Sequence, residues 1–326
     1  MEISEHPMKA GITRTPEFER KGLATHAVNT GIICGHQCAY CSSPSLFRTH
    51  PVFRQIGKSP FGTGYCIFDS TTPDRVARDA HSLRERGMIQ FCSFSDAWAP
   101  ECQERQLGRR CLQAILAEPE WTIRILTKNA AVRDDFDLIS QYRDRVLVGL
   151  SITGTPDKED AVTVLEPNAS SITERMLAMV EARTRGLRTY AMLCPLMPGL
   201  AAEPEQIDRL VKFAVEIAAE EIFVEPVNPR GPGLKRCQEQ LEKAGHTTEA
   251  AAIERIRHQT AWSDYVATLI HDVQTSVRHH TDITKLRFLL YPSNLTPTDR
   301  ARILEDDAGV IWLGKGELTK EVSTAP

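Results

Sequence analysis

Three closely spaced cysteines constrain this chain more than any other feature. Cys34, Cys38 and Cys41 follow a C-x3-C-x2-C spacing, with the aromatic residue Tyr40 just before the third. Iron–sulfur clusters are held by cysteine thiolates, usually four, so three protein ligands leave one iron of a four-iron cluster open to a small molecule. A structural zinc ion needs four ligands. His36 lies in the same loop but offers poor tetrahedral geometry, although a distant cysteine could complete the set. The spacing therefore favours a cluster over zinc.

Composition places the chain among ordinary globular proteins. Its 326 residues are 41% hydrophobic and 25% charged, with a formal net charge of −4. We find no run of 18 apolar residues and no signal-peptide pattern, so we expect a cytoplasmic protein without a membrane span. Disulfides are disfavoured in that compartment. We therefore interpret most of the scattered cysteines, Cys66, Cys102, Cys111, Cys194 and Cys237, as small core residues and assign no auxiliary cluster to them.

The order of elements predicts an α/β protein. Residues 1–25 are interpreted as an extended lead-in, and a strand at 26–29 runs into the cysteine loop. Residues 42–73 are rich in Pro, Gly, Ser and Thr and predict irregular structure. Ser171-Ile-Thr-Glu174 forms a capping box at the start of a helix. Further strands alternate with helices and are predicted at 88–94, 121–126, 146–152, 189–194 and 221–225.

Strands that alternate with helices imply parallel pairing with right-handed crossovers. Six such units predict a partial (β/α)6 TIM-type barrel over residues 26–230, preceded by the extension at 1–25. Residues 231–326 predict a mainly helical extension with a strand-like segment at 286–291 and a short tail that includes 310–313, which we interpret as a cap or a late barrel element. Chemistry in such barrels sits at the carboxyl ends of the strands, and the cysteine loop follows the first predicted strand.

The cysteine motif resembles the signature of the radical S-adenosylmethionine (SAM) superfamily. Later segments resemble the spore photoproduct lyase branch of that superfamily. The likeness runs over roughly residues 26–230, about two-thirds of the chain. The motif is specific for the superfamily, and the later segments are moderately specific for the branch. These segments are Ser95-Asp96, Thr127-Lys128, Ser151-Ile-Thr153, Leu165-Glu166-Pro167 with Arg175 behind it, and Cys194-Pro195.

The resemblance implies a 4Fe–4S cluster on Cys34, Cys38 and Cys41, with SAM as co-substrate. In the superfamily the open iron chelates the amino and carboxylate groups of SAM, and one electron from the cluster releases a 5′-deoxyadenosyl radical. The electron would come from a donor such as a flavodoxin or ferredoxin. The other candidate residues are expected to contact SAM: Tyr40 and Pro195 at the adenine, Ser95 and Asp96 at the ammonium, Lys128 at the carboxylate and Ser151 at the ribose.

Plainer interpretations stand beside these roles. Ser95 and Asp96 could simply cap the next helix, and Lys128 could be a solvated surface residue. Relatives that repair thymine dimers use a cysteine just before the Ser-Asp turn as a hydrogen donor. Here Cys92 lies one residue further from Asp96 than in that pattern, and Ser93 is nearer the expected place. Cys92 is therefore a candidate catalytic residue that could equally be a packed core residue.

The sequence favours a radical SAM enzyme that abstracts a hydrogen atom from an unidentified substrate. Two alternatives stay open: a DNA or RNA repair lyase of the same branch with Cys92 as a radical relay, and a zinc or iron–sulfur binding module without turnover. The net charge of −4 does not favour a nucleic-acid substrate. Candidate contacts for one are Arg105, Arg109, Arg110, Arg230, Lys235 and Arg236.

Overall fold

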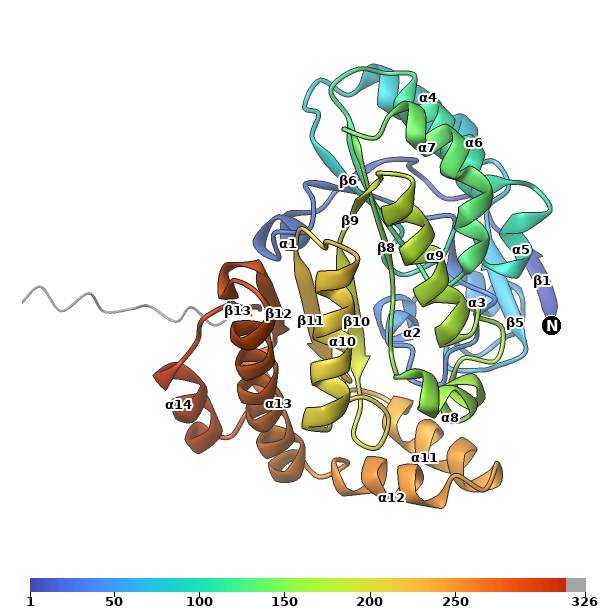
Figure 1. The fold of residues 1–326 in the computed structure, drawn as a ribbon. Helices are drawn as coiled ribbons and strands as arrows, with labels where there is room; N and C mark the ends of the chain where they lie inside the picture. The colour runs from blue at the N-terminus through green and yellow to red at the C-terminus, as the bar shows by residue number, and fades with distance from the viewer. Residues whose placement is uncertain (315–326) are drawn as a thin grey trace, which may run out of the picture.

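Parallel strands in two adjoining sheets form the centre of the molecule, in a computed structural model that describes residues 1–314 (Figure 1). The first sheet has the order β2-β3-β6-β7-β8-β9, and the second has the order β10-β11-β12-β13. In the first sheet β2 (Thr13–Arg14) pairs antiparallel with β3, and the other neighbours in both sheets pair in parallel. An isolated parallel bridge between Ser151 and Met192 links the two sheets.

The strands and helices alternate along the chain as the sequence predicts. The parallel strands are β3 (His26–Val28), β6 (Met88–Phe91), β7 (Thr122–Thr127), β8 (Val146–Leu150), β9 (Arg188–Thr189), β10 (Ala191–Leu196), β11 (Ile222–Pro226), β12 (Leu286–Leu290) and β13 (Val310–Trp312). The helices between and after them are α4 (Thr72–Ser82), α5 (Pro100–Gln103), α6 (Leu107–Leu116), α7 (Phe136–Gln141), α8 (Glu159–Leu165), α9 (Ile172–Thr184), α10 (Pro204–Glu216), α11 (Gly233–Lys243), α12 (Thr247–Arg255), α13 (Gln259–His280) and α14 (Pro297–Glu305). The predicted α/β class and partial barrel are confirmed.

Helix starts follow local sequence signals. At α9 the Ser171 side chain accepts the Glu174 N–H at 3.2 Å, and the Glu174 carboxylate accepts the Ser171 N–H at 2.8 Å. This is the predicted capping box, which satisfies two amide groups that the first helical turn leaves unpaired. Figure 1 shows α9, α10 and α13 on the outer side of the strands.

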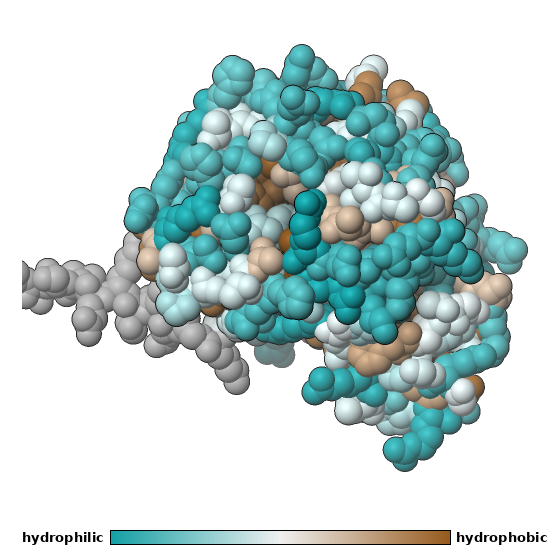
Figure 2. Space-filling view, turned by 90° about the horizontal axis from the view of Figure 1, so that it is seen from below, coloured by the Kyte–Doolittle hydropathy of each residue, from teal (hydrophilic) through white to brown (hydrophobic). Residues whose placement is uncertain are grey.

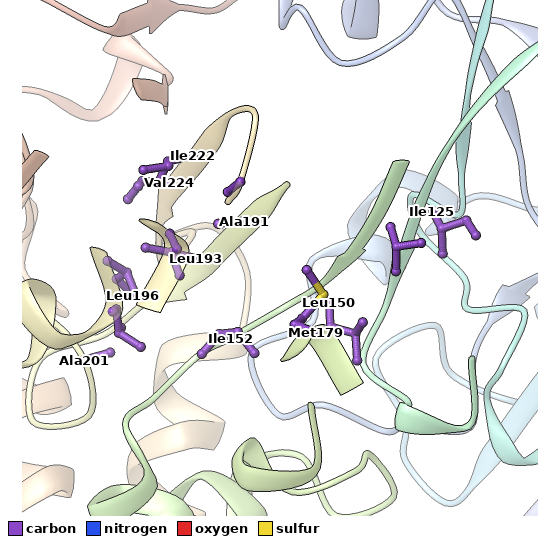
Figure 3. Packing of buried hydrophobic residues seen from close by; sticks show 14 of the residues in the cluster. Ile125, Leu150, Ile152, Met179, Ala191, Leu193, Leu196, Ala201, Ile222 and Val224 are labelled. Carbon is purple, nitrogen blue, oxygen red and sulfur yellow. The ribbon is translucent and has the colours of Figure 1, made fainter. Parts of the chain in front are cut away.

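Side chains alternate between the two faces of the curved sheet, because successive residues of a strand point to opposite sides. One set packs against the helices; Figure 3 shows Ile125, Leu150 and Met179 in this cluster, with Leu193 and Val224 further along the sheet. The other set packs on the opposite face and comprises Leu147, Tyr190, Met192, Phe223, Leu289 and Leu313, with Leu23 from the N-terminal segment.

A buried arginine lies among the residues of this second face. The Arg124 guanidinium lies 4.8 Å from the ring centre of Tyr190 and 5.0 Å from that of Phe223, and it donates a hydrogen bond of 2.7 Å to Glu221. Arg124 lies early in β7, away from the carboxyl end of the strand. These side chains therefore fill the inner face of the curved sheet, away from the carboxyl ends of the strands.

Two parts of the chain differ from the sequence expectations. Residues 42–73 were expected to be irregular, but they contain α2 (Ser43–Phe47), α3 (Pro51–Gln55) and β5 (Tyr65–Phe68). The lead-in at 1–25 was expected to be extended; β1 (Glu2–Glu5) agrees with this, but α1 (Pro16–Arg20) is a helix. β5 joins β1 and β4 (Gly31–Ile33) in a three-stranded sheet, and the complete burial of β5 gives the reason for its order.

From residue 231 to 314 the chain is mainly helical, and the last part of the predicted extension, residues 315–326, lies outside the described residues. The described part also adds β12 and β13 to the sheet of β10 and β11, so this region extends the barrel. Within residues 1–314, none of the helices combines the length and the apolar character needed to cross a membrane.

The close contact between Gly149 and Tyr190 gives a test of the inner packing. A Cβ at Gly149 would lie 2.3 Å from the buried Tyr190 ring, whose hydroxyl donates to the Ile125 carbonyl at 2.9 Å. We expect Gly149→Ala to lower the free energy of unfolding by about 1–3 kcal/mol, because overpacked cores must distort. Urea denaturation measures the change. An unchanged midpoint would show that the ring moves aside freely.

Candidate active site

One cavity of about 260 Å³ lies at the carboxyl ends of the strands. Figure 2, seen from below relative to Figure 1, shows a hollow on this side of the molecule with apolar residues inside it. All ten residues proposed from the sequence line this cavity: Cys34, Cys38, Tyr40, Cys41, Cys92, Ser95, Asp96, Lys128, Ser151 and Pro195. The structure thus brings together residues from five separate segments of the chain.

The cysteine loop follows β4, which belongs to the small sheet, and not β3 as the sequence suggested. Gln37 adopts a left-handed backbone conformation with φ of 56°. Its side chain donates to the Tyr65 carbonyl at 2.7 Å and accepts the Gly64 N–H at 2.8 Å. The Gly35 N–H donates to Glu101 at 2.9 Å, and a Cβ at Gly35 would lie 2.3 Å from that carboxylate. The loop is therefore fixed from both sides.

The three cysteine thiols are not gathered around a single zinc ion. Each is half-buried and free of disulfide bonds. A tetrahedral zinc ion with Zn–S bonds of about 2.3 Å would hold sulfurs about 3.8 Å apart, but the sulfurs of Cys34, Cys38 and Cys41 do not all lie within 4.8 Å of one another. The alternative ligand in the loop, His36, instead has its Nδ1 at 3.4 Å from Asp96 Oδ2.

Burial raises the pKa of Cys34 and Cys38 well above the ordinary thiol value, and the neighbouring cysteines add to the shift at Cys34. Such thiols keep their protons at neutral pH in the metal-free protein. A bound metal needs thiolates and displaces those protons, so metal binding here should release protons.

Asn29 organises the turn that carries Ser95 and Asp96. Its side-chain oxygen accepts the N–H groups of Ser93 at 2.9 Å and of Phe94 at 3.1 Å. The Ser95 hydroxyl in turn accepts the Thr30 N–H at 2.9 Å. The end of β3 therefore positions the segment that follows β6.

Asp96 links the ends of neighbouring strands. It accepts the Trp98 N–H at 2.9 Å, a contact within the turn. Asp96 does not cap the next helix, as the sequence also allowed, because the N-cap of α5 is Ala99. The Thr127 hydroxyl donates to Asp96 at 2.8 Å and the Lys128 N–H donates at 2.9 Å, both from the end of β7. Both carboxylate oxygens thus have protein partners. These contacts give Asp96 a role in positioning the strand ends. The expected contact between Asp96 and the SAM ammonium stays a prediction.

Lys128 points into the cavity region and not into solvent. Its side chain is 15% exposed. Its ammonium lies 3.5 Å from Glu166 Oε1, 3.4 Å from the Cys194 carbonyl and 5.6 Å from the ring centre of Tyr40. Burial lowers the pKa of Lys128 from its ordinary value. The solvated-surface alternative is therefore excluded for this lysine.

Glu166 connects most of these groups, although the sequence identified it only as part of a resemblance. Its carboxylate has no exposed surface and is paired with Arg175. It also accepts hydrogen bonds from the hydroxyls of Tyr40 and, at 3.0 Å, Thr153. Arg175 donates onward to the Ser151 carbonyl at 3.0 Å. The pair thus joins the cysteine loop to the end of β8.

Cys92 remains open to both of its interpretations. It is 1% exposed and belongs to the outer core cluster, yet it also borders the cavity. Burial raises the pKa of its thiol well above the ordinary value, so the thiol carries its hydrogen at neutral pH. A packing role and a hydrogen-donor role are both compatible with this position.

The far side of the cavity contains residues that the sequence analysis did not propose. Phe18, Lys21 and Leu23 reach it from the N-terminal segment. Glu225 lies at the end of β11 and accepts a hydrogen bond from the Cys194 thiol at 3.3 Å. The position of Glu225 at a strand end was a usable signal. Lys21 had none, because the sequence gives no sign that the lead-in folds back onto the barrel.

A second group of metal-binding residue types lies away from the cavity. Asp208 on α10 and His279 and His280 at the end of α13 place one ligand atom each within 4.8 Å of one another. His280 Nε2 is 2.7 Å from Asp208 Oδ1. This group must be controlled for in any zinc analysis of the protein.

Comparisons with known proteins support the fold. No family model matches the chain. An uncharacterised protein of Acidianus two-tailed virus is 22% identical over 222 residues, which cover 66% of this chain and 71% of that protein. An uncharacterised protein of Methanocaldococcus jannaschii is 28% identical over 179 residues, which cover 54% of this chain and 62% of that protein.

The structure of spore photoproduct lyase complexed with dinucleoside spore photoproduct aligns with a TM-score of 0.51 at 13% identity. The alignment covers 74% of this chain and 66% of that one, slightly less than two thirds of its length. The chain shares the fold of spore photoproduct lyase. The resemblance predicted from the sequence is thus confirmed at the level of the fold.

The Glu166–Arg175 pair makes a stability prediction. Arg175→Met should lower the free energy of unfolding of the metal-free protein by about 3–5 kcal/mol, because it leaves a buried carboxylate without its main partner. Arg183→Met on the exposed face of the same helix is the matched control and should change it by no more than about 0.5 kcal/mol.

The double variant Glu166→Gln/Arg175→Met removes both charges and should recover part of the loss. Urea denaturation of the three variants measures these differences. Equal effects of Arg175→Met and Arg183→Met would show that the pair does not stabilise the fold.

Proposed function

We propose that the protein is a radical SAM enzyme, which holds a 4Fe–4S cluster on Cys34, Cys38 and Cys41 and abstracts a hydrogen atom from a substrate. One observation carries this proposal: three half-buried thiols at cluster-type spacing share one cavity with a half-buried lysine, whose ammonium lies 3.5 Å from Glu166. When bound, the cluster would supply the electron that cleaves SAM to methionine and the 5′-deoxyadenosyl radical.

The residues around the thiols suit the recognition of SAM. Lys128 offers its remaining ammonium hydrogens to a carboxylate, while Glu166 and the Cys194 carbonyl fix its position. Tyr40 donates its hydroxyl to Glu166, so its ring is held beside the lysine. Ser151, whose carbonyl is held by Arg175, borders the same cavity and is our candidate for the ribose.

The protein itself contributes position and exclusion of water. The adenosyl carbon must lie close to the target hydrogen for transfer, which requires a rigid cavity. Networks through Asp96 and Glu166 supply that rigidity, because each joins separate strand ends through buried hydrogen bonds. Leu126, Met192 and Leu289 provide apolar walls that limit access of water.

The cluster assignment is tested by metal content. After anaerobic reconstitution, the wild-type protein should contain about four irons with matching sulfide. Cys38→Ala should remain folded but lose the iron and the brown colour, because it removes one of three protein ligands. Cys111→Ala is the control and should retain both, since Cys111 is buried in α6 outside the cavity.

Zinc in place of iron at these cysteines would contradict the proposal and support a non-catalytic zinc module. Zinc that persists in Cys38→Ala and disappears in His280→Ala would belong to the Asp208 group instead. A Cys38→Ala protein with full iron content would also contradict the proposal.

SAM binding should depend on Lys128. Charge-assisted hydrogen bonds to a carboxylate are worth ~1.5–3 kcal/mol. Lys128→Ala should therefore weaken SAM binding roughly ten-fold or more, since about 1.4 kcal/mol is a factor of ten. Iron content should stay unchanged. Calorimetry measures the affinity, with Lys212→Ala on the exposed side of α10 as the control. Equal SAM affinity in both variants would remove Lys128 from the SAM site.

A further inference from the structure

The charge distribution around the cysteine loop is unlike that of the rest of the chain. The whole sequence has 43 acidic residues among 326 and a net charge of −4. From Arg20 to Phe68, however, it contains no Asp or Glu, while it carries five Lys and Arg residues, at positions 20 and 21 before the cysteines and at 48, 54 and 58 after them. Within an acidic protein, the segment that holds the three cysteines is therefore basic.

Part of this charge is displayed on one surface. Arg48 follows α2 and Arg54 lies in α3; both are exposed, as is Lys9. Within residues 1–314 none of these three cations has a carboxylate within 4.0 Å. The ring of His50, between Arg48 and Arg54 in the sequence, packs at 5.4 Å from that of His6, which places the Lys9 segment beside α3.

The two acidic residues of β1 are paired with other cations. Glu2 pairs with Lys58 at 2.6 Å, and Glu5 pairs with Arg105 at 3.0 Å. An exposed apolar side chain, Leu46, adds to the cations; it is 72% exposed. We call Lys9, Leu46, Arg48 and Arg54 the α2–α3 face. It combines unpaired positive charge with one apolar contact point.

The α2–α3 face is adjacent to the cysteine loop. α2 begins at Ser43, two residues after Cys41, and Ser42 and Ser43 line the cavity. On the same helix the Phe47 ring lies 4.7 Å from that of Phe94, another cavity residue. One short helix thus separates the cavity that holds the thiols from the basic surface outside it.

We propose that the α2–α3 face is the docking surface for a small acidic electron-transfer protein of the flavodoxin or ferredoxin type. The inference rests on the proposed function, because only a protein with a reducible cluster needs such a donor. One electron leaves the reduced flavin or iron–sulfur centre of the donor and enters the cysteine-bound cluster; no atoms are exchanged. Complementary charge would steer encounter and set its orientation.

Electron transfer from a reduced flavodoxin to the oxidised, reconstituted protein tests this proposal. Arg48→Glu/Arg54→Glu should lower the second-order rate constant about ten-fold or more at low ionic strength, and the difference should shrink in high salt. The rate with dithionite and the iron content should not change, because neither residue lines the cavity. Stopped-flow absorbance under anaerobic conditions measures both rates.

Arg183→Glu/Lys212→Glu is the matched control. Both pairs change the formal net charge from −4 to −8, because each reversal replaces one positive charge by one negative charge. Arg183 and Lys212 are exposed on α9 and α10. If the control pair slowed electron transfer from flavodoxin as much as Arg48→Glu/Arg54→Glu does, the effect would come from net charge alone. That result would overturn the proposal.

Two further outcomes distinguish the proposal from its alternatives. Unchanged flavodoxin kinetics in Arg48→Glu/Arg54→Glu, together with lost binding of a single-stranded oligonucleotide, would assign the face to nucleic acid and contradict our proposal. A wild-type protein that accepts no electron even from dithionite would refute the proposed function. Calorimetry with flavodoxin then tests docking by itself, and the absence of binding would overturn the docking surface.

Discussion

The site depends on a carboxylate that has no exposed surface. Glu166 follows α8 and pairs with Arg175 of α9, and the two side chains are 0% and 1% exposed. Burial of an ion pair is costly unless its remaining hydrogen-bonding groups are satisfied. Here the hydroxyls of Tyr40 and Thr153 donate hydrogen bonds to Glu166, and the carbonyl of Ser151 accepts one from Arg175. These hydrogen bonds fix the positions of the cysteine loop, the end of β8 and Lys128 relative to one another.

A second buried carboxylate, that of Asp96, also joins separate strand ends at the cavity. Asp96 joins the segment after β6 to the end of β7 through Thr127 and the Lys128 backbone. The two networks meet at Lys128, whose backbone is held by Asp96 and whose ammonium lies beside Glu166. This arrangement holds the Lys128 ammonium and the three thiols around a common cavity.

The sequence predicted the barrel because its signals are local and repeated. Strands such as β8 are buried at every position and appear as uninterrupted apolar runs, which is typical of parallel sheets covered on both faces. The structure of residues 42–73 was harder to predict, because their Pro and Gly content is typical of loops. Proline is also common at the first positions of helices, and the two short helices there begin at or next to Pro44 and Pro51. The lead-in at 1–25 is ordered by pairing with distant strands, which periodicity does not reveal.

The candidate site was predictable where strand ends carry polar residues, since parallel strands bring their carboxyl ends to one edge. That rule gathered all ten proposed residues around one cavity. It could not identify Lys21, which reaches the cavity from outside the barrel pattern, or show that Asp96 is already engaged by the protein. Hydrogen-bond partners distant in sequence decide such roles, and they require the folded geometry.

The central claim is that these residues turn SAM into a radical source. Its most direct test is the detection of 5′-deoxyadenosine by liquid chromatography and mass spectrometry, after anaerobic incubation of the reconstituted, dithionite-reduced protein with SAM. The account predicts 5′-deoxyadenosine and methionine in equal amounts, with a yield that rises when a true substrate is added. A protein with its full complement of iron and sulfide that binds SAM, accepts electrons and still forms no 5′-deoxyadenosine would contradict it.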